Sequence, residues 1–239
     1  MKIFSRFNKA LVQFLAVLAL FLVAAPAFAA EQGQVTRVIL ARHGQTEFNR
    51  KDIFQGNADP NLNETGIKQA ELLAEALKNT HIDVFISTPF KRAIQTTEKV
   101  AALHNQKIAY TDERFKTIDF GDLTGMTRPD AYKKYPEIEK QLKETPWLVK
   151  YPGGESFSDV GDRGMKALTD AVKKYPGKTI FIGAHRTVNR AVIIRALGMD
   201  PSMFLKLGQD NTCINVLEYE NGQWRLMLLN STVHLNGKY

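Results

Sequence analysis

Cysteine is nearly absent from the sequence, and this scarcity excludes two common ways of stabilising a fold. The only cysteine is Cys213, so an intramolecular disulfide is impossible and a cysteine zinc cluster cannot form. Internal repeats and low-complexity linkers are also missing, and the counts of glycine (16) and proline (9) are ordinary for a globular protein. With 44% hydrophobic and 24% charged residues over 239 positions, the composition instead indicates a globular protein with a sizeable core.

Dense basic clusters are also missing, although the formal net charge is +7. The nearest approach to a cluster is Lys133-Lys134, repeated as Lys173-Lys174, and both pairs are more simply interpreted as solvated faces. Domains that bind nucleic acid usually concentrate Lys and Arg on one face. We therefore expect no nucleic-acid partner, and the mild positive excess fits a negatively charged small substrate better.

The N-terminus has the pattern of a secretory signal peptide. Residues 1–9 carry three basic residues and no acid, residues 10–25 are apolar apart from Gln13, and Ala-Phe-Ala occupies 27–29. A basic start, an apolar middle and a small-x-small end predict cleavage after Ala29. The prediction is a signal peptide over 1–29 and a periplasmic or secreted mature protein whose net charge falls to +4.

An uncleaved membrane anchor is the alternative for this segment. Residues 10–30 come close to the length that spans a bilayer. Cleavage is favoured because the small residues stand where the peptidase needs them, and a cleaved chain would have no stable membrane association.

The rest of the chain, residues 30–239, alternates strands and helices and is predicted to form a single domain. Strands are expected at 35–41, 83–87 and 179–184, and helices at 64–78, 90–103, 157–174 and 187–197. A hairpin is expected where 214–219 and 224–229 flank Glu220-Asn221-Gly222. Alternation of this kind predicts a three-layer α/β/α sandwich with a mostly parallel central sheet, whose ligands bind beyond the carboxyl ends of the strands.

Histidine and arginine follow the predicted strands at that edge. Arg42-His43 ends the first strand, His185 ends the strand at 179–184, and Arg92 lies just inside the helix after a third strand. Guanidinium groups hold phosphate by paired hydrogen bonds, and imidazole is a nucleophile near neutral pH. The cluster therefore suggests phosphoryl transfer through a phosphohistidine.

These residues belong to an ordered set of motifs that resembles the histidine phosphatase superfamily, with its phosphoglycerate mutase-like fold. The leading motif is Arg42-His43-Gly44-Gln45-Thr46 followed by Asn49. Further family-like stretches keep the same order: Gln55-Gly56, Leu62 to Gly66 with Gln69-Ala70, Ser87 to Arg92, Phe120-Gly121, Tyr135-Pro136, Pro152-Gly153-Gly154-Glu155-Ser156, and Ala184-His185 with Asn189-Arg190. The similarity extends from about Thr36 to about His234.

The resemblance implies roles for individual residues. His43 would be the nucleophile, with its other ring N–H held by a group such as a backbone carbonyl. The clamp on the phosphoryl oxygens would comprise Arg42, Arg92 and His185. Further substrate contacts are implied for Thr46, Asn49 and Gln55. Gly44 suits a tight turn that lets the backbone approach the phosphate. Because the cations are all side chains, we expect neither a metal nor another cofactor.

One departure from the family concerns the proton donor. Many relatives carry a glutamate four residues before the Phe-Gly glycine, where this chain has Thr117. Losing a general acid costs about 10²–10⁴-fold in rate. We favour Asp119 as a substitute, with Glu155 or Asp122 reaching in from a loop as alternatives. Otherwise the protein is slow, or prefers leaving groups that need no proton, such as phosphoanhydrides or acyl phosphates.

Two further features bear on substrate choice. Arg186 stands where many relatives have glycine, and either adds a cation for a multiply charged substrate or faces solvent. The segment around 126–155 is rich in aromatic and basic residues, and is interpreted as a lid over an anionic organic phosphate or as a helical cap packed by its own aromatics.

Taken together, the sequence predicts an exported histidine acid-type phosphatase that hydrolyses phosphate monoesters of small organic molecules through phospho-His43. One alternative is a non-catalytic or weakly active protein that binds phosphate or sugar phosphate. A phosphoglycerate-type mutase is disfavoured because it needs a phosphorylated cofactor and a cytosolic substrate.

Overall fold

A mixed sheet of six strands lies at the centre of the part of the chain that the structure describes. The structure is a computed structural model that describes residues 34–237, so the predicted signal peptide and its cleavage site lie outside the described residues. The strands lie in the order β3-β2-β4-β1-β5-β6. Their bounds are β1 (Thr36–Arg42), β2 (Val84–Ser87), β3 (Tyr110–Thr111), β4 (Thr179–Ala184), β5 (Ile214–Glu220) and β6 (Gln223–Ser231).

The strand directions confirm the predicted sheet type. The pairs β1–β4, β4–β2 and β2–β3 are parallel, whereas β5 is antiparallel to β1 and forms a hairpin with β6. At the hairpin turn Asn221 and Gly222 have φ of 50° and 81°, the left-handed values that tight hairpin turns require. The sheet is thus mostly parallel, with one antiparallel edge.

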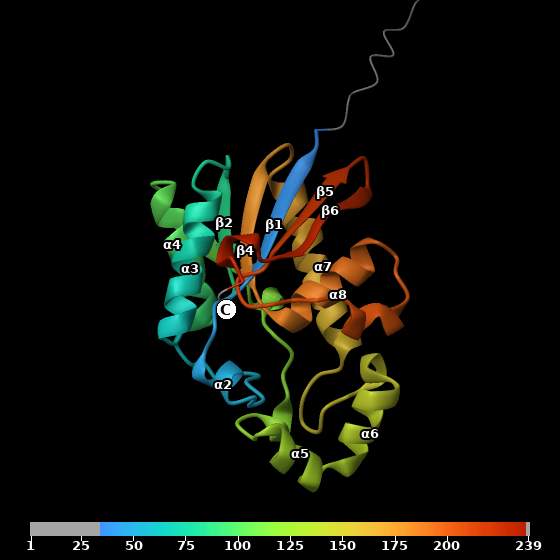
Figure 1. Ribbon diagram of the computed structural model, residues 1–239. Helices are drawn as coiled ribbons and strands as arrows, with labels where there is room; N and C mark the ends of the chain where they lie inside the picture. The colour runs from blue at the N-terminus through green and yellow to red at the C-terminus, as the bar shows by residue number, and fades with distance from the viewer. Residues whose placement is uncertain (1–33, 238–239) are drawn as a thin grey trace, which may run out of the picture. The chain divides into compact units, whose positions relative to one another are not determined.

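Helices cover both faces of the sheet. The α-helices are α2 (Glu47–Arg50), α3 (Glu64–Leu77), α4 (Lys91–Leu103), α5 (Arg128–Lys134), α6 (Pro136–Glu144), α7 (Phe157–Lys174) and α8 (Arg186–Ala196). The 3₁₀ turns are η1 (Glu113–Phe115), η2 (Gly121–Leu123), η3 (Pro146–Leu148), η4 (Pro201–Lys206) and η5 (Val233–Leu235). Figure 1 shows α3 and α4 on one face and α7 and α8 on the other, which confirms the three layers.

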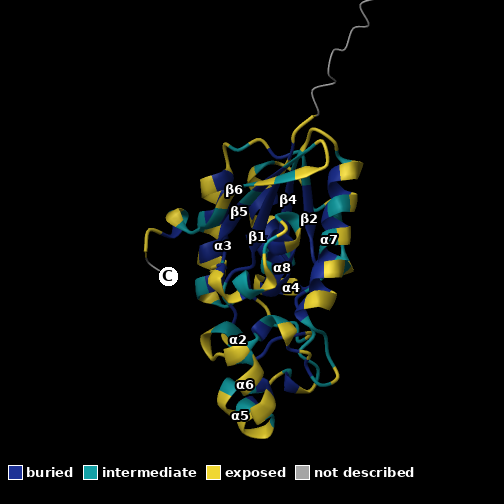
Figure 2. Cartoon of the chain, turned by 90° about the vertical axis from the view of Figure 1, so that its right-hand side faces the viewer, coloured by how far each residue is buried: buried dark blue, intermediate teal, exposed yellow. Residues whose placement is uncertain are grey.

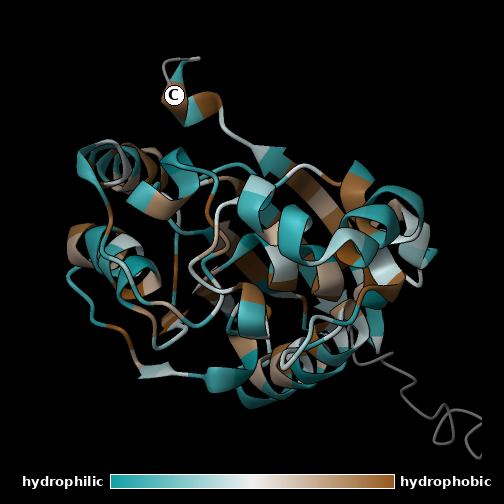
Figure 3. Cartoon of the chain, turned by 90° about the horizontal axis from the view of Figure 1, so that it is seen from below, coloured by the Kyte–Doolittle hydropathy of each residue, from teal (hydrophilic) through white to brown (hydrophobic). Residues whose placement is uncertain are grey.

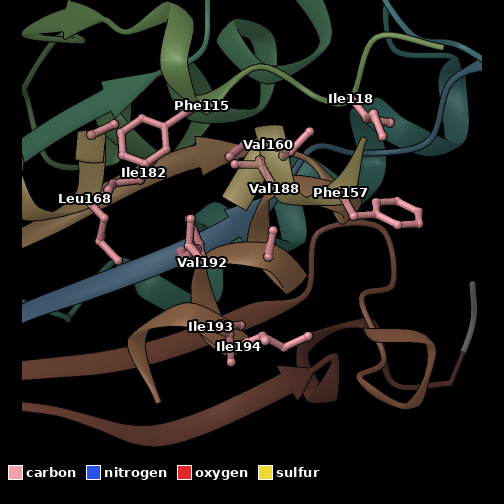
Figure 4. Packing of buried hydrophobic residues seen from close by; sticks show 14 of the residues in the cluster. Phe115, Ile118, Phe157, Val160, Leu168, Ile182, Val188, Val192, Ile193 and Ile194 are labelled. Atoms are coloured by element: carbon pink, nitrogen blue, oxygen red, sulfur yellow. The ribbon is translucent and has the colours of Figure 1, made fainter. Parts of the chain in front are cut away.

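Within residues 34–237 the protein has two hydrophobic clusters, one on each face of the sheet, because side chains alternate in direction along each strand. In β1, Val38 and Leu40 join the cluster beneath α7 and α8, whereas Ile39 and Ala41 join the cluster beneath α3 and α4. Successive side chains of a strand point to opposite faces, so one apolar run serves both cores. Figure 4 shows part of the first cluster, where Leu168 and other side chains of α7 and α8 meet at β4.

Local capping explains where two of these helices begin. The Asn63 side chain accepts a hydrogen bond from Gly66 N at 2.8 Å and caps α3, and asparagine is among the residues preferred at this position. Ser156 and Asp159 form a reciprocal capping box at the start of α7. These helix starts lie where the sequence analysis places them, within a residue.

The segment from α5 to η3 lies beyond the carboxyl ends of the parallel strands (Figure 1). Much of its surface is exposed, in contrast to the buried strands (Figure 2). Seen from this end, much of the helical ribbon is coloured hydrophilic, and hydrophobic stretches include strands that lie behind the helices (Figure 3). In residues 34–237 the structure contains no helix that is both apolar and long enough to cross a membrane.

Candidate active site

The backbone of His43 is fixed from two sides at the end of β1. Its N–H donates to the carbonyl oxygen of Ala184 at the end of β4, at 3.1 Å. Its carbonyl oxygen accepts from Thr212 N at 3.3 Å and from Asn211 Nδ2 at 2.9 Å. The parallel pair β1–β4 and the loop before β5 together hold this residue in place.

The ring of His43 is held in the form that a nucleophile needs. Its Nδ1 lies 2.7 Å from the carbonyl oxygen of Gly44, and because a carbonyl only accepts, Nδ1 carries the proton. Nε2 is then left with a free lone pair. Burial, followed by the charges of Arg92 and Arg42, lowers the pKa of His43 well below its usual value, so the ring is neutral. The expected backbone carbonyl partner is confirmed.

Gly44 is required for a different reason from the one its sequence suggests. Its φ is not among the left-handed values found at other glycines, so no special turn is made here. A Cβ at Gly44 would instead lie 2.5 Å from the carbonyl oxygen of Gly66. Gly44 N also donates to Thr96 Oγ1 at 3.0 Å. The loop after β1 is thus clamped between the first turn of α3 and the body of α4.

His185 meets His43 as predicted from the parallel pairing of their strands. It is the N-cap residue of α8, and the two ring centroids lie 5.1 Å apart. Its Nε2 lies 2.9 Å from Thr88 Oγ1, and its buried Nδ1 has no hydrogen-bond partner within residues 34–237. Burial, then the charge of Arg92, lowers the pKa of His185 well below its usual value.

Arg42 and Arg92 place two buried cations beside the imidazoles, with exposed fractions of 2% and 1%. Arg42 Nη1 donates to the carbonyl oxygen of Gln209 at 2.8 Å, and Arg92 Nη1 donates to that of Ala58 at 2.9 Å. In the described part of the chain, Nε of each guanidinium has no partner. Burial lowers the pKa of Arg42 to about 9 and that of Arg92 to about 10, so both keep their charge at neutral pH. Buried, partly unpaired cations of this kind are suited to hold an anion.

These side chains line one cavity of about 270 Å³ at the carboxyl ends of the strands. Seven predicted site residues belong to its lining: Arg42, His43, Asn49, Gln55, Arg92, His185 and Arg186. Thr117 lines it too, which places the family's missing acid position at the pocket. Thr46 does not, because its hydroxyl accepts from Asn49 N at 3.2 Å and caps α2.

Asp119 and Glu155 do not join this lining, contrary to their expected roles. The Asp119 carboxylate accepts from Gly121 N at 2.8 Å, and Gly121 has φ of +51°, so the side chain stabilises a turn. Glu155 forms a two-pronged ion pair with Arg163, with Nε–Oε1 and Nη2–Oε2 each 2.8 Å. Asp122 is occupied with the Tyr135 hydroxyl at 3.3 Å. None of the three proposed substitute acids is therefore placed to protonate a leaving group.

Several lining residues escaped the sequence analysis. Arg128 and Tyr151 reach the pocket from the predicted lid segment, and Asn211 reaches it from the loop before β5. The antiparallel pairing of β5 with β1 brings that loop to the end of β1, but nothing in the sequence indicates which strand β5 would join. Arg128 lies in a segment whose path the strand pattern does not determine.

Positive charge dominates the pocket. Among the residues that the structure describes, its lining includes five arginines, of which Arg128, Arg186 and Arg190 lie outside the buried pair, and a single carboxylate, Asp52. No group of three or more His, Cys, Asp or Glu side chains within residues 34–237 is arranged to hold a metal ion. The chemistry open to this site is therefore the binding of an anion beside a neutral imidazole nucleophile.

Comparisons with known proteins agree with this geometry. Residues 38–232 match the sequence model of the histidine phosphatase superfamily (branch 1). Phosphoserine phosphatase 1 of Hydrogenobacter thermophilus is 35% identical over 205 residues, covering 86% of this chain and 97% of the relative.

Solved structures agree as well. A mutant phosphoserine phosphatase of Entamoeba histolytica in complex with phosphoserine is 30% identical, with a TM-score of 0.75 over 84% of this chain and 99% of that one. YhfR of Bacillus stearothermophilus is 25% identical, with a TM-score of 0.80 over 84% of this chain and 99% of that one.

Proposed function

The chain belongs to branch 1 of the histidine phosphatase superfamily, and we propose that it is an exported phosphatase that hydrolyses phosphate monoesters through a phosphohistidine on His43. Phosphatase activity is supported by relatives that include phosphoserine phosphatases. The observation that carries the proposed mechanism is the neutral His43 ring, with its Nδ1 proton fixed on the Gly44 carbonyl, beside two buried guanidinium groups.

In the first step the lone pair on His43 Nε2 attacks phosphorus. The bond to the leaving oxygen breaks and its electron pair stays on that oxygen. Charge spreads over the three phosphoryl oxygens in the transition state, where Arg42, Arg92 and His185 would hold them. The guanidinium groups need no reorganisation, because backbone carbonyl oxygens already orient them.

In the second step water attacks the phosphohistidine. The P–N bond breaks, its electron pair returns to Nε2, and inorganic phosphate is released. The lowered pKa of His43 keeps the nucleophile unprotonated in mildly acidic solution, which supports an acid-type phosphatase.

The test is p-nitrophenyl phosphate hydrolysis by protein purified from cells that express the full chain. We expect turnover that His43→Ala abolishes. His81→Ala is the matched control, because the His81 side chain is 83% exposed and, among residues 34–237, pairs with Asp83 alone. Full activity in His43→Ala would refute the nucleophile assignment.

A non-catalytic phosphate-binding protein is the second candidate. The observation that favours it is Thr117 at the pocket, where many relatives carry an acid. Phosphate binding without turnover of p-nitrophenyl phosphate would establish it, since nitrophenolate leaves without needing a proton.

Export rests on the pattern of residues 1–29 alone. N-terminal sequencing of the purified protein tests it directly. A mature chain beginning at Ala30 in the periplasm or medium supports export, whereas an intact Met1 start on a membrane-bound protein supports the anchor.

A further inference from the structure

Resting on the proposed function, we propose that the preferred substrates are phosphoanhydrides, in which the group that leaves is itself a phosphate. Two independent features of the pocket point to this substrate class. One is the shortage of proton donors near His43, and the other is a surplus of arginine beyond the pair that would hold the transferred phosphoryl group.

The only carboxyl group in the described lining is poorly suited to donate a proton. Asp52 accepts from Arg128 Nε at 2.7 Å, and its side chain is 69% exposed. The three carboxylates suggested by the sequence hold a turn, an ion pair and a tyrosine hydroxyl outside the lining. A general acid would therefore have to come from another kind of side chain.

The hydroxyl groups in the lining do not supply one. The hydroxyls of Thr117 and Thr187 are not general acids at neutral pH, and burial raises the pKa of Tyr151 further above its usual value. An alkoxide leaves slowly unless it is protonated, and the lack of a general acid lowers the rate by about 10²–10⁴-fold. A phosphate leaves as a stable anion, so the missing acid would matter least for an anhydride.

The surplus arginines would serve that leaving phosphate. Arg186 and Arg190 lie one turn apart on α8, which puts them on the same face of the helix, and both line the pocket. Arg190 Nε donates to the carbonyl oxygen of Leu207 at 2.6 Å, which orients its guanidinium. The Arg186 side chain makes no hydrogen bond or ion pair with any residue in the described range 34–237, although the residue opens α8 and lines the pocket. Mutual repulsion among such cations is relieved when an anion with a second charged group binds.

For inorganic pyrophosphate the step balances as follows. His43 Nε2 attacks one phosphorus, the bond from that phosphorus to the bridging oxygen breaks, and inorganic phosphate departs with the electron pair and no added proton. Water then attacks the phosphohistidine, and the P–N electron pair returns to Nε2. Both protons of the water leave on the second phosphate, which releases one to solvent at neutral pH.

Four probe substrates separate the two features. p-Nitrophenyl phosphate has a good leaving group and no second anionic group. Phenyl phosphate has a poorer leaving group and also lacks a second anionic group. Phosphoserine has a poor leaving group and a second anionic group. Pyrophosphate has both a good leaving group and a second anionic group. Assays of the full chain contain EDTA so that pyrophosphate is not complexed by metal. We expect kcat/KM for pyrophosphate to exceed that for phosphoserine by about 10²-fold or more.

Variants on α8 test the second anion site. Arg186→Gln should lower the ratio of kcat/KM for pyrophosphate to that for p-nitrophenyl phosphate by about tenfold. Arg195→Gln is the matched control, because Arg195 lies on the same helix but pairs with Asp162 at 2.9 Å, outside the pocket. It should leave the ratio unchanged.

The outcomes distinguish this inference from the proposed function. Phosphoserine turned over as fast as pyrophosphate, with p-nitrophenyl phosphate activity lost in His43→Ala, would overturn the inference and leave the phosphohistidine mechanism standing. An unchanged ratio in Arg186→Gln would overturn the second anion site. No turnover of any of the four probes would overturn both proposals.

Discussion

Replacing Thr117 with an acid should raise the rate at which the protein hydrolyses phosphate monoesters that have poor leaving groups. Thr117 is 8% exposed and lines the pocket, and its carbonyl oxygen is held by Arg163 Nη2 at 2.8 Å, so its backbone is anchored. In Thr117→Glu the new carboxyl group would enter the cavity of about 270 Å³ that holds His43.

The size of the increase in kcat/KM in Thr117→Glu depends on the charged groups around the new carboxyl group. A positioned general acid contributes about 10²–10⁴-fold. Nearby Arg42 and Arg92 would favour the ionised carboxylate, so only part of the population would carry the proton at neutral pH. We therefore expect the lower end, about 10²-fold in kcat/KM for phenyl phosphate. The gain should grow as pH falls, because protonation of the carboxyl group increases.

The assay compares phenyl phosphate with p-nitrophenyl phosphate in the wild-type protein, Thr117→Glu and Thr117→Gln. Glutamine has nearly the same shape but cannot donate a carboxyl proton, so it controls for size. The reasoning is refuted if Thr117→Glu raises kcat/KM equally for both esters. It is also refuted if Thr117→Gln raises kcat/KM for phenyl phosphate as much as Thr117→Glu does. Urea unfolding of both variants establishes that the native fold is retained.

Three further predictions concern protonation, stability and metal ions. Because the pKa of His43 is lowered, kcat/KM for p-nitrophenyl phosphate should stay constant as the pH falls through 6.5, once titration of the substrate is corrected for. It should fall only at lower pH, where His43 Nε2 becomes protonated. A fall centred on pH 6.5 that is caused by His43 would contradict this. Arg163→Ala should lower the free energy of unfolding in urea by about 3 kcal/mol, since the side chain binds Glu155 and three backbone carbonyls; a loss below about 0.5 kcal/mol would refute that role. EDTA should leave activity unchanged, because the clamp consists of side chains, and a loss restored by added metal would disprove this.

The central elements could be predicted because local patterns determine them. The strand at 179–184 and the helix at 157–174 have the predicted bounds, since an apolar run and a capped amphipathic face each end at strong stop signals. The helix expected at 187–197 lies at 186–196, because His185 takes the N-cap position. The pairing of His43 with His185 follows from parallel strands that end at the same edge.

The substitute acid could not be predicted, because its position depends on the path of a loop. Asp119 would share a face with Thr117 only if the chain were extended there, because residues two apart then point the same way. The chain instead turns at Gly121, whose N–H binds the Asp119 carboxylate. Arg128 and Asn211 were missed because long-range packing, rather than any local pattern, brings them to the pocket.

Trapping the covalent intermediate tests the account most directly. The full chain is mixed with p-nitrophenyl phosphate, quenched in alkali within one turnover, digested and analysed by mass spectrometry. The account predicts one phosphoryl group on the peptide that contains His43, and none in His43→Ala. A phosphoryl group on another residue, or a burst of nitrophenolate that persists in His43→Ala, would contradict it.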